Sequence, residues 1–277
     1  MTTILITGAT AGIGLESARQ LAAQGHRLLL VGRSPAKLES AAAAVRQAGS
    51  QQVDTLTCDL SDLAAVRRLA EQVRGTVDHL DVLVNNAGTV FDKRTLTPEG
   101  HEATFATNHL GGFLLTELLL DLMIASAPSR IVFTSSTGHY QGTMDFDDLG
   151  YERGYSIMKA YSRSKLANVL YTRDLADRLA GSGVTVNCLH PGAVATDIWD
   201  GAPWFARPVL AVAKRISMIS PAEGGARITH LATSPDVEGA TGGYYDDDRL
   251  RTPSELAQDA AIGRRLVEVS RELVGLA

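Results

Sequence analysis

Short apolar runs alternate with amphipathic, helix-like stretches along almost the whole chain, and this alternation restricts the fold more than any other feature. Strand-like runs lie near residues 3–7, 27–32, 52–57, 80–85, 129–135, 184–190 and 242–245, and helix-like stretches lie near 12–24, 35–48, 62–74, 99–126, 156–181, 221–233 and 253–274. Strands separated by helices form right-handed crossovers and assemble into a parallel sheet with helices on both faces. The sequence therefore predicts an α/β fold with a single doubly wound, Rossmann-type sheet of about seven strands.

No linker and no internal repeat interrupts this pattern, so residues 1–277 are expected to form one domain. Two irregular stretches, 137–159 and 197–220, depart from it. In a doubly wound sheet, ligands bind beyond the carboxyl ends of the strands, where loops such as these emerge. The stretch 197–220 contains both tryptophans of the chain and is predicted to be a substrate loop.

The first strand-like run leads through three glycines, Gly8, Gly12 and Gly14, into a helix-like stretch. In a phosphate-binding turn, the first glycine permits the tight turn and the second lets the backbone approach a pyrophosphate. The third glycine allows the helix to pack closely against the strand, and the helix N-terminus offers free N–H groups to the anion. Because glycines are common in any turn of this kind, this motif needs support from other residues.

Tyr161 and Lys165 lie four positions apart in the predicted helix 156–181. On a helix this spacing places both side chains on one face, one turn apart. An ammonium group beside a phenol favours the phenolate, so Tyr161 is expected to exchange a proton nearer neutral pH than a free tyrosine. Tyr155 and Lys159 form a second pair with the same spacing. The Tyr161 pair is preferred because a long, uninterrupted helical pattern continues after it.

Charge and composition argue against several classes of function. The net charge of −5 argues against nucleic acid as a main partner, and no His, Cys or Asp cluster has the spacing of metal ligands. Residues 113–127 contain Glu117 and Asp121, so this stretch is expected to be too short and too charged to span a membrane. Cys58 and Cys188 are expected to be buried, reduced thiols. With no leader before the first strand, the sequence predicts a cytoplasmic protein.

A series of short motifs resembles the short-chain dehydrogenase/reductase family, and within it the retinol-dehydrogenase-like branch. In chain order, the motifs are Thr7-Gly8-x-x-x-Gly12-Ile13-Gly14, Cys58-Asp59-Leu60, Asn85-Asn86-Ala87-Gly88, Asn108-His109-Leu110-Gly111, Ser135-Ser136, Tyr161-x-x-x-Lys165 and His190-Pro191-Gly192. The C-terminal Gly243-Tyr244-Tyr245 and the helix that contains residues 261–266 also resemble that branch. The resemblance covers essentially the whole chain, and it implies a nicotinamide-dependent oxidoreductase.

The resemblance implies a role for each of four polar residues. Tyr161 is expected to be the acid/base, and Lys165 to lower the pKa of that tyrosine and to hold the nicotinamide ribose. Ser136 is expected to hydrogen-bond to the substrate oxygen, whereas the neighbouring Ser135 is expected to be a structural hydroxyl at the strand end. Asn108 is expected to kink its helix and to keep a water in a proton relay to the lysine. The residues after Lys165 also match the family, which supports this pair over the earlier one.

The end of the second predicted strand favours NADP(H), with NAD(H) as the alternative cofactor. Gly32 stands where a protein that prefers NAD is expected to place a carboxylate for the ribose 2′-hydroxyl. Arg33 follows directly, and Lys37 lies one helical turn further on. A guanidinium binds a 2′-phosphate through two hydrogen bonds, whereas a carboxylate repels it. The competing interpretation is that Arg33 is an exposed residue at a helix start.

The resemblance assigns the remaining cofactor contacts to three segments. The phosphate turn comprises Gly8, Thr10, Gly12, Ile13 and Gly14. The adenine side comprises Asp59, Leu60, Asn86, Ala87 and Gly88. The nicotinamide side comprises Pro191, Gly192, Val194 and Thr196. Asp59 is equally well explained as a loop carboxylate or a helix cap. His109, His139 and His190 are interpreted as structural residues.

These features together predict an oxidoreductase that transfers a hydride between NADP(H) and an apolar alcohol, aldehyde or ketone. Two alternatives stay open: a C=C reductase, as in the similar protochlorophyllide reductases, or a non-catalytic regulatory protein that senses NADP(H). The sensor is disfavoured because all four residues of the expected catalytic set are present. In this family, helices corresponding to 99–126 and 156–181 often pair subunits, which implies a homodimer or homotetramer.

Overall fold

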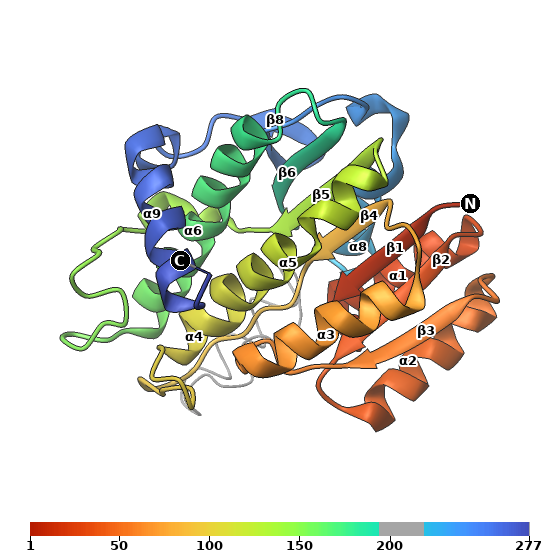
Figure 1. The fold of residues 1–277 in the computed structure, drawn as a ribbon, viewed down its shortest axis with the longest axis horizontal. Helices are drawn as coiled ribbons and strands as arrows, with labels where there is room; N and C mark the ends of the chain where they lie inside the picture. The colour runs from red at the N-terminus through yellow and green to blue at the C-terminus, as the bar shows by residue number, and fades with distance from the viewer. Residues whose placement is uncertain (194–218, 277) are drawn as a thin grey trace.

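The computed structural model describes residues 1–193 and 219–276, and its central feature is one sheet (Figure 1). The described residues form eight strands in the order β3-β2-β1-β4-β5-β6-β7-β8. The strands are β1 (Thr3–Thr7), β2 (Arg27–Gly32), β3 (Val53–Thr57), β4 (Val82–Asn85), β5 (Ser129–Thr134), β6 (Val184–His190), β7 (Tyr244–Asp246) and β8 (Arg249–Arg251). All neighbouring pairs are parallel except β7 and β8. The predicted doubly wound sheet is confirmed.

Helices cover both faces of this sheet (Figure 1). One layer contains α1 (Gly12–Ala23), α2 (Pro35–Ala48) and α8 (Pro221–Thr233); the other contains α3 (Leu63–Thr76), α5 (Gly111–Ala125) and α6 (Ile157–Arg178), with α9 (Ala260–Leu273) packed on α6. Alternate residues of a strand enter different cores: Ile4 packs with the first layer and Leu5 with the second. Burial on both faces explains why the central strands read as continuous apolar runs.

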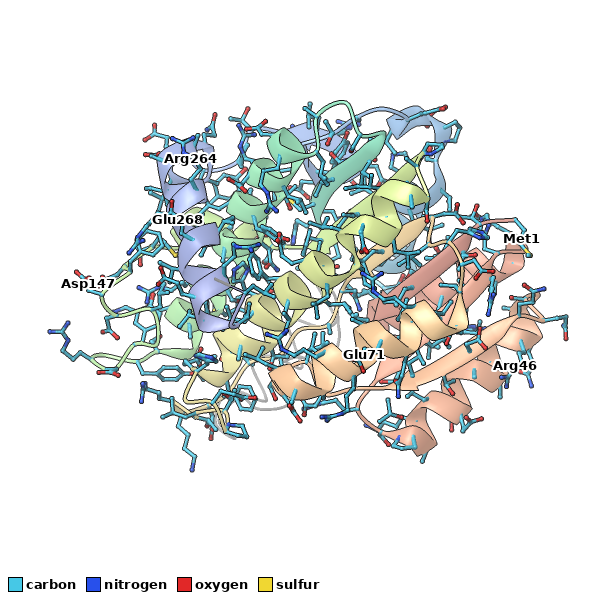
Figure 2. The ribbon with its side chains drawn as sticks, in the orientation of Figure 1. Met1, Arg46, Glu71, Asp147, Arg264 and Glu268 are labelled. Carbon is cyan, nitrogen blue, oxygen red and sulfur yellow. The ribbon has the colours of Figure 1, made fainter. Side chains whose placement is uncertain are left out.

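The outer faces of the helices carry charge. Figure 2 shows Arg46 of α2, Glu71 of α3 and Glu268 of α9 pointing away from the molecule, and all three are exposed. Apolar residues on the inner face and charged residues on the outer face produce the helical period that made these helices predictable.

The antiparallel edge strand β8 was not predicted, and it adds one strand to the seven predicted runs. β8 consists of three exposed residues and has no apolar run. Asp247 and Asp248 join β7 to β8, and their φ angles are 54° and 56°. Aspartate tolerates this left-handed conformation, so two residues suffice to reverse the chain in a tight hairpin.

The predicted helix 99–126 is shorter and less regular than expected. It begins with α4 (Ala103–Phe105), where both carboxylate oxygens of Glu102 accept hydrogen bonds from backbone N–H groups. A π-helical segment, Ala106–Leu110, follows and leads directly into α5. A π-helical turn distorts a helix locally and is frequent at functional sites. Hydrophobic periodicity does not reveal such a turn.

The stretch Ala103–Ala125 is long and apolar enough to cross a membrane, by length and composition alone. The expectation from the sequence concerned the shorter stretch 113–127, whereas the longer helical stretch meets the length and composition criterion. In the structure, 61% of its most apolar window is buried. A core helix of a soluble protein meets the same criterion, so the finding is weak evidence for a membrane span.

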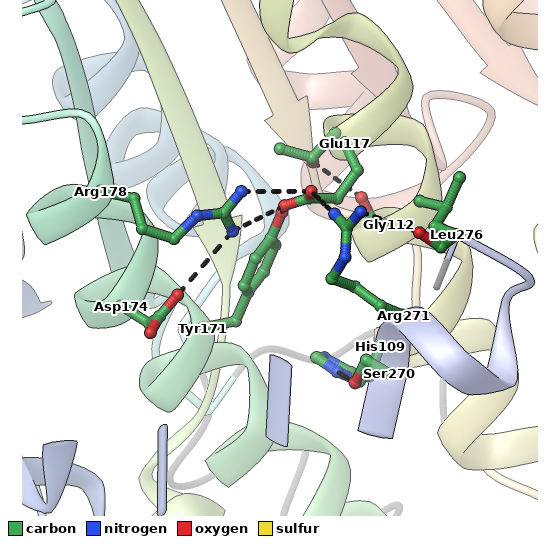
Figure 3. A network of polar contacts seen from close by, with 10 residues as sticks. His109, Gly112, Glu117, Tyr171, Asp174, Arg178, Ser270, Arg271 and Leu276 are labelled. Carbon is green, nitrogen blue, oxygen red and sulfur yellow. Dashed lines mark hydrogen bonds and ion pairs between the residues drawn. The ribbon is translucent and has the colours of Figure 1, made fainter. Parts of the chain in front are cut away.

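The C-terminal helix α9 is anchored by a buried carboxylate. Glu117 of α5 accepts hydrogen bonds from Arg178 of α6 at 2.8 and 3.2 Å, from Arg271 of α9 at 2.8 Å, and from the Tyr171 hydroxyl at 2.8 Å (Figure 3). Arg271 also donates to the carbonyl of Leu276. A buried ion pair is stable when hydrogen bonds satisfy its groups. One side chain therefore joins α5, α6 and α9.

Candidate active site

A cavity of about 1300 Å³ lies at the carboxyl ends of the strands, where the strand order reverses between β1 and β4. Most of the residues predicted for the site line it: Gly8, Thr10, Gly12, Ile13, Gly14, Arg33, Leu60, Asn86, Ala87, Gly88, Ser136, Tyr161, Lys165, Pro191 and Gly192. Asp59 and Asn108 are not among the described lining residues. Val194 and Thr196 lie outside the described residues. The predicted substrate loop 197–220 also lies outside them, except for its last two residues.

The glycine turn leaves no room for side chains. A Cβ atom at Gly14 would lie 2.3 Å from the carbonyl oxygen of Gly8, and one at Gly8 would lie 2.9 Å from the Cα of Ala87. Gly8 also has a φ of 69°, which favours glycine. The N-terminus of α1 has no side-chain cap and no acidic residue in its first turn. Its free N–H groups and positive dipole end therefore suit a phosphate.

Asn86 braces this turn from the end of β4. Its amide Nδ2 donates to the carbonyl oxygens of Thr7 at 2.9 Å and Gly8 at 3.4 Å, and its backbone N–H donates to the Thr7 hydroxyl. The amide hydrogens of Asn86 are thus committed to the turn. Ala87 and Gly88 follow and line the cavity with backbone.

On the adenine side, the cavity wall is formed by Cys58 and Leu60 rather than by Asp59. One carboxylate oxygen of Asp59 accepts from the Ser61 backbone N–H at 2.9 Å and from the Ser61 hydroxyl at 2.7 Å. These contacts match the alternative interpretation of Asp59 as a loop carboxylate. The helix cap itself is Asp62, which accepts from the N–H of Ala65.

Two cations lie at the edge of the cavity beyond β2. Arg33 and Lys37 are both exposed lining residues, and no described carboxylate forms a salt bridge with either. Beneath them, a Cβ atom at Gly32 would lie 2.6 Å from the Thr10 methyl group. The side chains present therefore fit a cofactor that carries an additional phosphate at this end.

Tyr161 and Lys165 are buried on the cavity side of α6, with Tyr161 9% exposed and Lys165 2% exposed. The Lys165 ammonium donates to the carbonyl of Thr134 at 3.0 Å and lies 5.6 Å from the centre of the Tyr161 ring. The Ser136 side chain hydrogen-bonds to that of Tyr161. The adjacent Ser135 hydroxyl instead donates to the Lys165 carbonyl at 2.9 Å, which is a structural contact.

The competing Tyr155–Lys159 pair does not share a helix face. α6 begins at Ile157, so Tyr155 precedes it, and the Tyr155 hydroxyl donates to the carbonyl of Phe91 at 2.9 Å. Lys159 is exposed and does not line the cavity, as far as the described residues show. Of the irregular stretch 137–159, the described lining residues are Thr137, Gly138, Tyr140 and Gln141 near its start and Met158 in the first turn of α6.

The acid–base properties differ from the simple expectation for a tyrosine beside a lysine. Burial raises the pKa of Tyr161, although the hydrogen bond with Ser136 acts in the opposite direction. Burial also lowers the pKa of Lys165 to about 8. The charge of the lysine alone would favour the phenolate, but desolvation dominates here because both groups are enclosed. At neutral pH, the Tyr161 phenol is therefore neutral, and Lys165 is protonated in most molecules.

Asn108 lies in the π-helical segment behind the cavity wall. Its amide Nδ2 donates to the Thr89 carbonyl and the Ser164 hydroxyl, both at 3.0 Å, and its Oδ1 accepts from the Thr89 N–H at 2.8 Å. A Cβ atom at Gly88 would lie 3.4 Å from both Asn108 Oδ1 and Lys165 Nζ. The helical distortion that the resemblance implied at Asn108 is present, and it brings this residue close to Lys165.

Comparison with known proteins agrees with this geometry. The family model for short chain dehydrogenases matches residues 2–203. The chain belongs to the short-chain dehydrogenase/reductase family. Among its relatives, retinol dehydrogenase 14 of Mus musculus is 41% identical, over 99% of this chain and 86% of its own length. Retinol dehydrogenase 13 of Homo sapiens is 39% identical, over 99% of this chain and 85% of its own length.

Solved structures share the fold of this short-chain dehydrogenase. A crystal structure of an uncharacterised protein from Mycobacterium paratuberculosis is 31% identical, with a TM-score of 0.80, and the match covers 99% of this chain and 94% of the other. An NAD(P)-dependent gluconate 5-dehydrogenase from Beutenbergia cavernae, with bound NADP, is 27% identical, with a TM-score of 0.71 over 89% and 95% of the two chains. The chain is therefore an oxidoreductase of a family that uses NAD(P)(H).

A buried histidine is expected to make the protein sensitive to acid. Burial lowers the pKa of His109 from 6.5 to about 4, so below pH 6.5 the unfolded chain takes up a proton that the folded protein does not. The free energy of unfolding should fall by about 2 kcal/mol from this group between about pH 7 and about pH 5. Urea unfolding at both pH values measures the loss. His109→Phe keeps the ring contacts with Phe105 and Phe113, and its free energy of unfolding should fall correspondingly less between the two pH values. Equal losses in the two proteins would contradict the assignment of the acid sensitivity to His109.

Proposed function

We propose that this chain is an NADP(H)-dependent oxidoreductase that interconverts an apolar alcohol and the corresponding aldehyde or ketone, with Tyr161 as the acid/base. The observation that carries the proposal is the meeting of two hydroxyls, those of Tyr161 and Ser136, with a buried lysine in the cavity that also contains the glycine turn. A hydride acceptor or donor bound along that turn needs only one proton to be managed beside it.

Each polar side chain has a part in that chemistry. The nicotinamide, when bound, supplies or accepts the hydride. Tyr161 and Ser136 hydrogen-bond to the substrate oxygen and stabilise the charge that develops on it. Tyr161 then donates the proton in reduction and accepts it in oxidation. The Lys165 ammonium, held on the Thr134 carbonyl, stabilises the phenolate that Tyr161 becomes.

The preference for NADP(H) is proposed to depend on Arg33, because its guanidinium lies at the cavity edge with no described carboxylate partner. Arg33→Asp should weaken NADPH binding by about 10- to 100-fold, since a charge-assisted hydrogen bond is replaced by repulsion, and should leave NADH binding much less affected. Fluorescence titration with each cofactor measures the two affinities. Arg249→Asp, an equal charge change at an exposed position of β8, is the control. An unchanged preference in Arg33→Asp would make Arg33 a surface residue only.

An apolar substrate is proposed because apolar side chains line the cavity that contains the reacting hydroxyls. Val90, Phe91, Tyr140 and Met158 are among them, and sequence reasoning had not singled them out. Small-molecule sites are mostly apolar with few polar anchors, as here. The names of the retinol dehydrogenases point in the same direction for those relatives.

Oxidation of NADPH and NADH by the purified protein, across a panel of apolar aldehydes and ketones, tests the proposal. NADPH-preferring turnover that Tyr161→Phe abolishes would support a carbonyl reductase. Tight NADPH binding without turnover of any carbonyl would overturn it in favour of C=C reduction or of an NADP(H) sensor.

A further inference from the structure

A chain of buried hydrogen bonds leads from α9 to the neighbourhood of Lys165. Ser270 Oγ lies 3.0 Å from His109 Nε2 (Figure 3), and His109 Nδ1 lies 3.2 Å from Asn168 Oδ1. Asn168 Nδ2 lies 3.0 Å from the carbonyl oxygen of Asn108 and 3.4 Å from that of Thr134. The side chains of Ser270, His109 and Asn168 are almost completely buried. This series of hydrogen bonds connects α9, the π-helical segment, α6 and the end of β5.

The direction of the hydrogen bonds in this series follows from its two carbonyl ends and from the charge of His109. The two carbonyl oxygens can only accept, so the amide nitrogen of Asn168 faces them and its Oδ1 faces His109. His109 must then carry a hydrogen on Nδ1. Burial lowers the pKa of His109 to about 4, so the imidazole is neutral near pH 7 and its Nε2 accepts from the Ser270 hydroxyl.

Asn168 shares an acceptor with the lysine of the candidate active site. The Thr134 carbonyl accepts from Lys165 Nζ at 3.0 Å and from Asn168 Nδ2 at 3.4 Å. The same carboxamide binds the Asn108 carbonyl, where the helix is distorted. A side chain that inserts into the hydrogen bonds of a helix is a recognised cause of such a distortion. Asn168 thus ties the distorted helix to the acceptor that locates Lys165.

We propose that Asn168 is a positioning residue for Lys165, and that His109, held by Ser270, fixes the orientation of the Asn168 carboxamide. The inference rests on the proposed function, since Lys165 matters there as the partner of the acid/base. Without the donor on His109, the carboxamide can rotate and turn its oxygen toward two carbonyl oxygens. That contact is repulsive, so the Thr134 carbonyl and Lys165 would shift.

The titratable groups around this site are few in the described part of the chain. His190 at the end of β6 interacts electrostatically with Lys165, and Tyr244 of β7 interacts with Tyr161. His139 is buried against the carbonyl of Ser136. None of these groups contacts the Asn168 carboxamide, so a substitution at His109 or Ser270 reaches them only through Lys165.

His109→Phe and Ser270→Ala test the proposal. His109→Phe should lower kcat by about 10- to 100-fold, as expected for a small displacement of a catalytic group, and should shift the pH profile of turnover. Ser270→Ala should shift the profile in the same direction by less. His109→Gln, which restores a donor, should recover part of the loss.

Tyr171→Phe is the matched control, because it removes one buried hydrogen bond of the same helix, to Glu117, and keeps the ring that packs against His109. It should lower Tm and leave the pH profile unchanged. The proposal is overturned if His109→Phe lowers Tm in the same way with an unchanged profile. If His109→Phe does not fold, an unchanged profile in Ser270→Ala overturns it.

The pH dependence of NADPH binding, followed by fluorescence from about pH 6 to about pH 10, provides a reading that does not need turnover. A shifted binding profile in His109→Phe supports the positioning role even if the wild type reduces no carbonyl. Absence of carbonyl turnover in the wild type would count against the proposed function alone. A binding profile identical to that of the wild type would count against the positioning role.

Discussion

Tyr161→Phe is expected to lower turnover by about 10²- to 10⁴-fold, the usual contribution of general acid–base catalysis. The hydroxyl that hydrogen-bonds to Ser136 is lost, and no other described residue places a proton donor at the same point of the cavity. The ring stays, so the buried packing of α6 is kept and NADPH affinity should be nearly unchanged. Steady-state kinetics with an apolar aldehyde and a fluorescence titration with NADPH measure the two quantities.

Tyr155→Phe is the control for that experiment. The Tyr155 hydroxyl donates to the Phe91 carbonyl, outside the hydroxyl pair at Ser136. Turnover of this variant should therefore stay near that of the wild type. If Tyr155→Phe is the inactive variant and Tyr161→Phe retains activity, the assignment of the acid/base is wrong.

Gly14→Ala is expected to weaken both stability and NADPH binding. The new Cβ atom would meet the Gly8 carbonyl oxygen at 2.3 Å and Asn86 Nδ2 at 2.5 Å, and neither can move without displacing the turn. Overpacking of this kind costs about 1–3 kcal/mol, more than the gain in helix propensity from replacing a glycine. Because the turn must shift to relieve the contact, NADPH affinity should fall by about tenfold or more.

Gly75→Ala is the matched control. Gly75 lies in α3, and a Cβ atom there would meet nothing within 4 Å. This substitution should be neutral or should stabilise the protein by up to about 1 kcal/mol. Urea unfolding and NADPH titration of both variants separate the two cases, and equal behaviour of Gly14→Ala and Gly75→Ala would refute the steric argument.

The sheet was predictable because its strands and helices carry strong local patterns. The predicted bounds of the strand 184–190 and of the helices 35–48 and 221–233 agree with the structure. β8 was missed because its three residues are exposed and its hairpin turn uses two aspartates. The predicted start of the helix at residue 99 was wrong because residues 99–102 precede the helix, which begins at Ala103 with Glu102 as its cap.

The candidate site was predictable only as a set of residues. Motif order placed Ser136, Tyr161 and Lys165 together, and the structure brings all three to one cavity. The direction in which the pKa of Tyr161 shifts was not predictable from spacing, because it depends on how completely other elements enclose the phenol. The contacts of Asp59 with Ser61 were not predictable from spacing either, and the adenine contact of Asp59 stays a prediction.

The amino-acid sequence by itself determined the order of strands and helices and the position of the glycine turn. Both follow from residue types close together in the chain: periodicity sets the elements, and small residues set the turn. Only the tertiary structure decided which polar groups share hydrogen bonds, as His109 and Ser270 do across 161 positions. The physical reason is that burial and hydrogen-bond partners depend on segments that meet only after folding, and these set the protonation states on which the proposed chemistry depends.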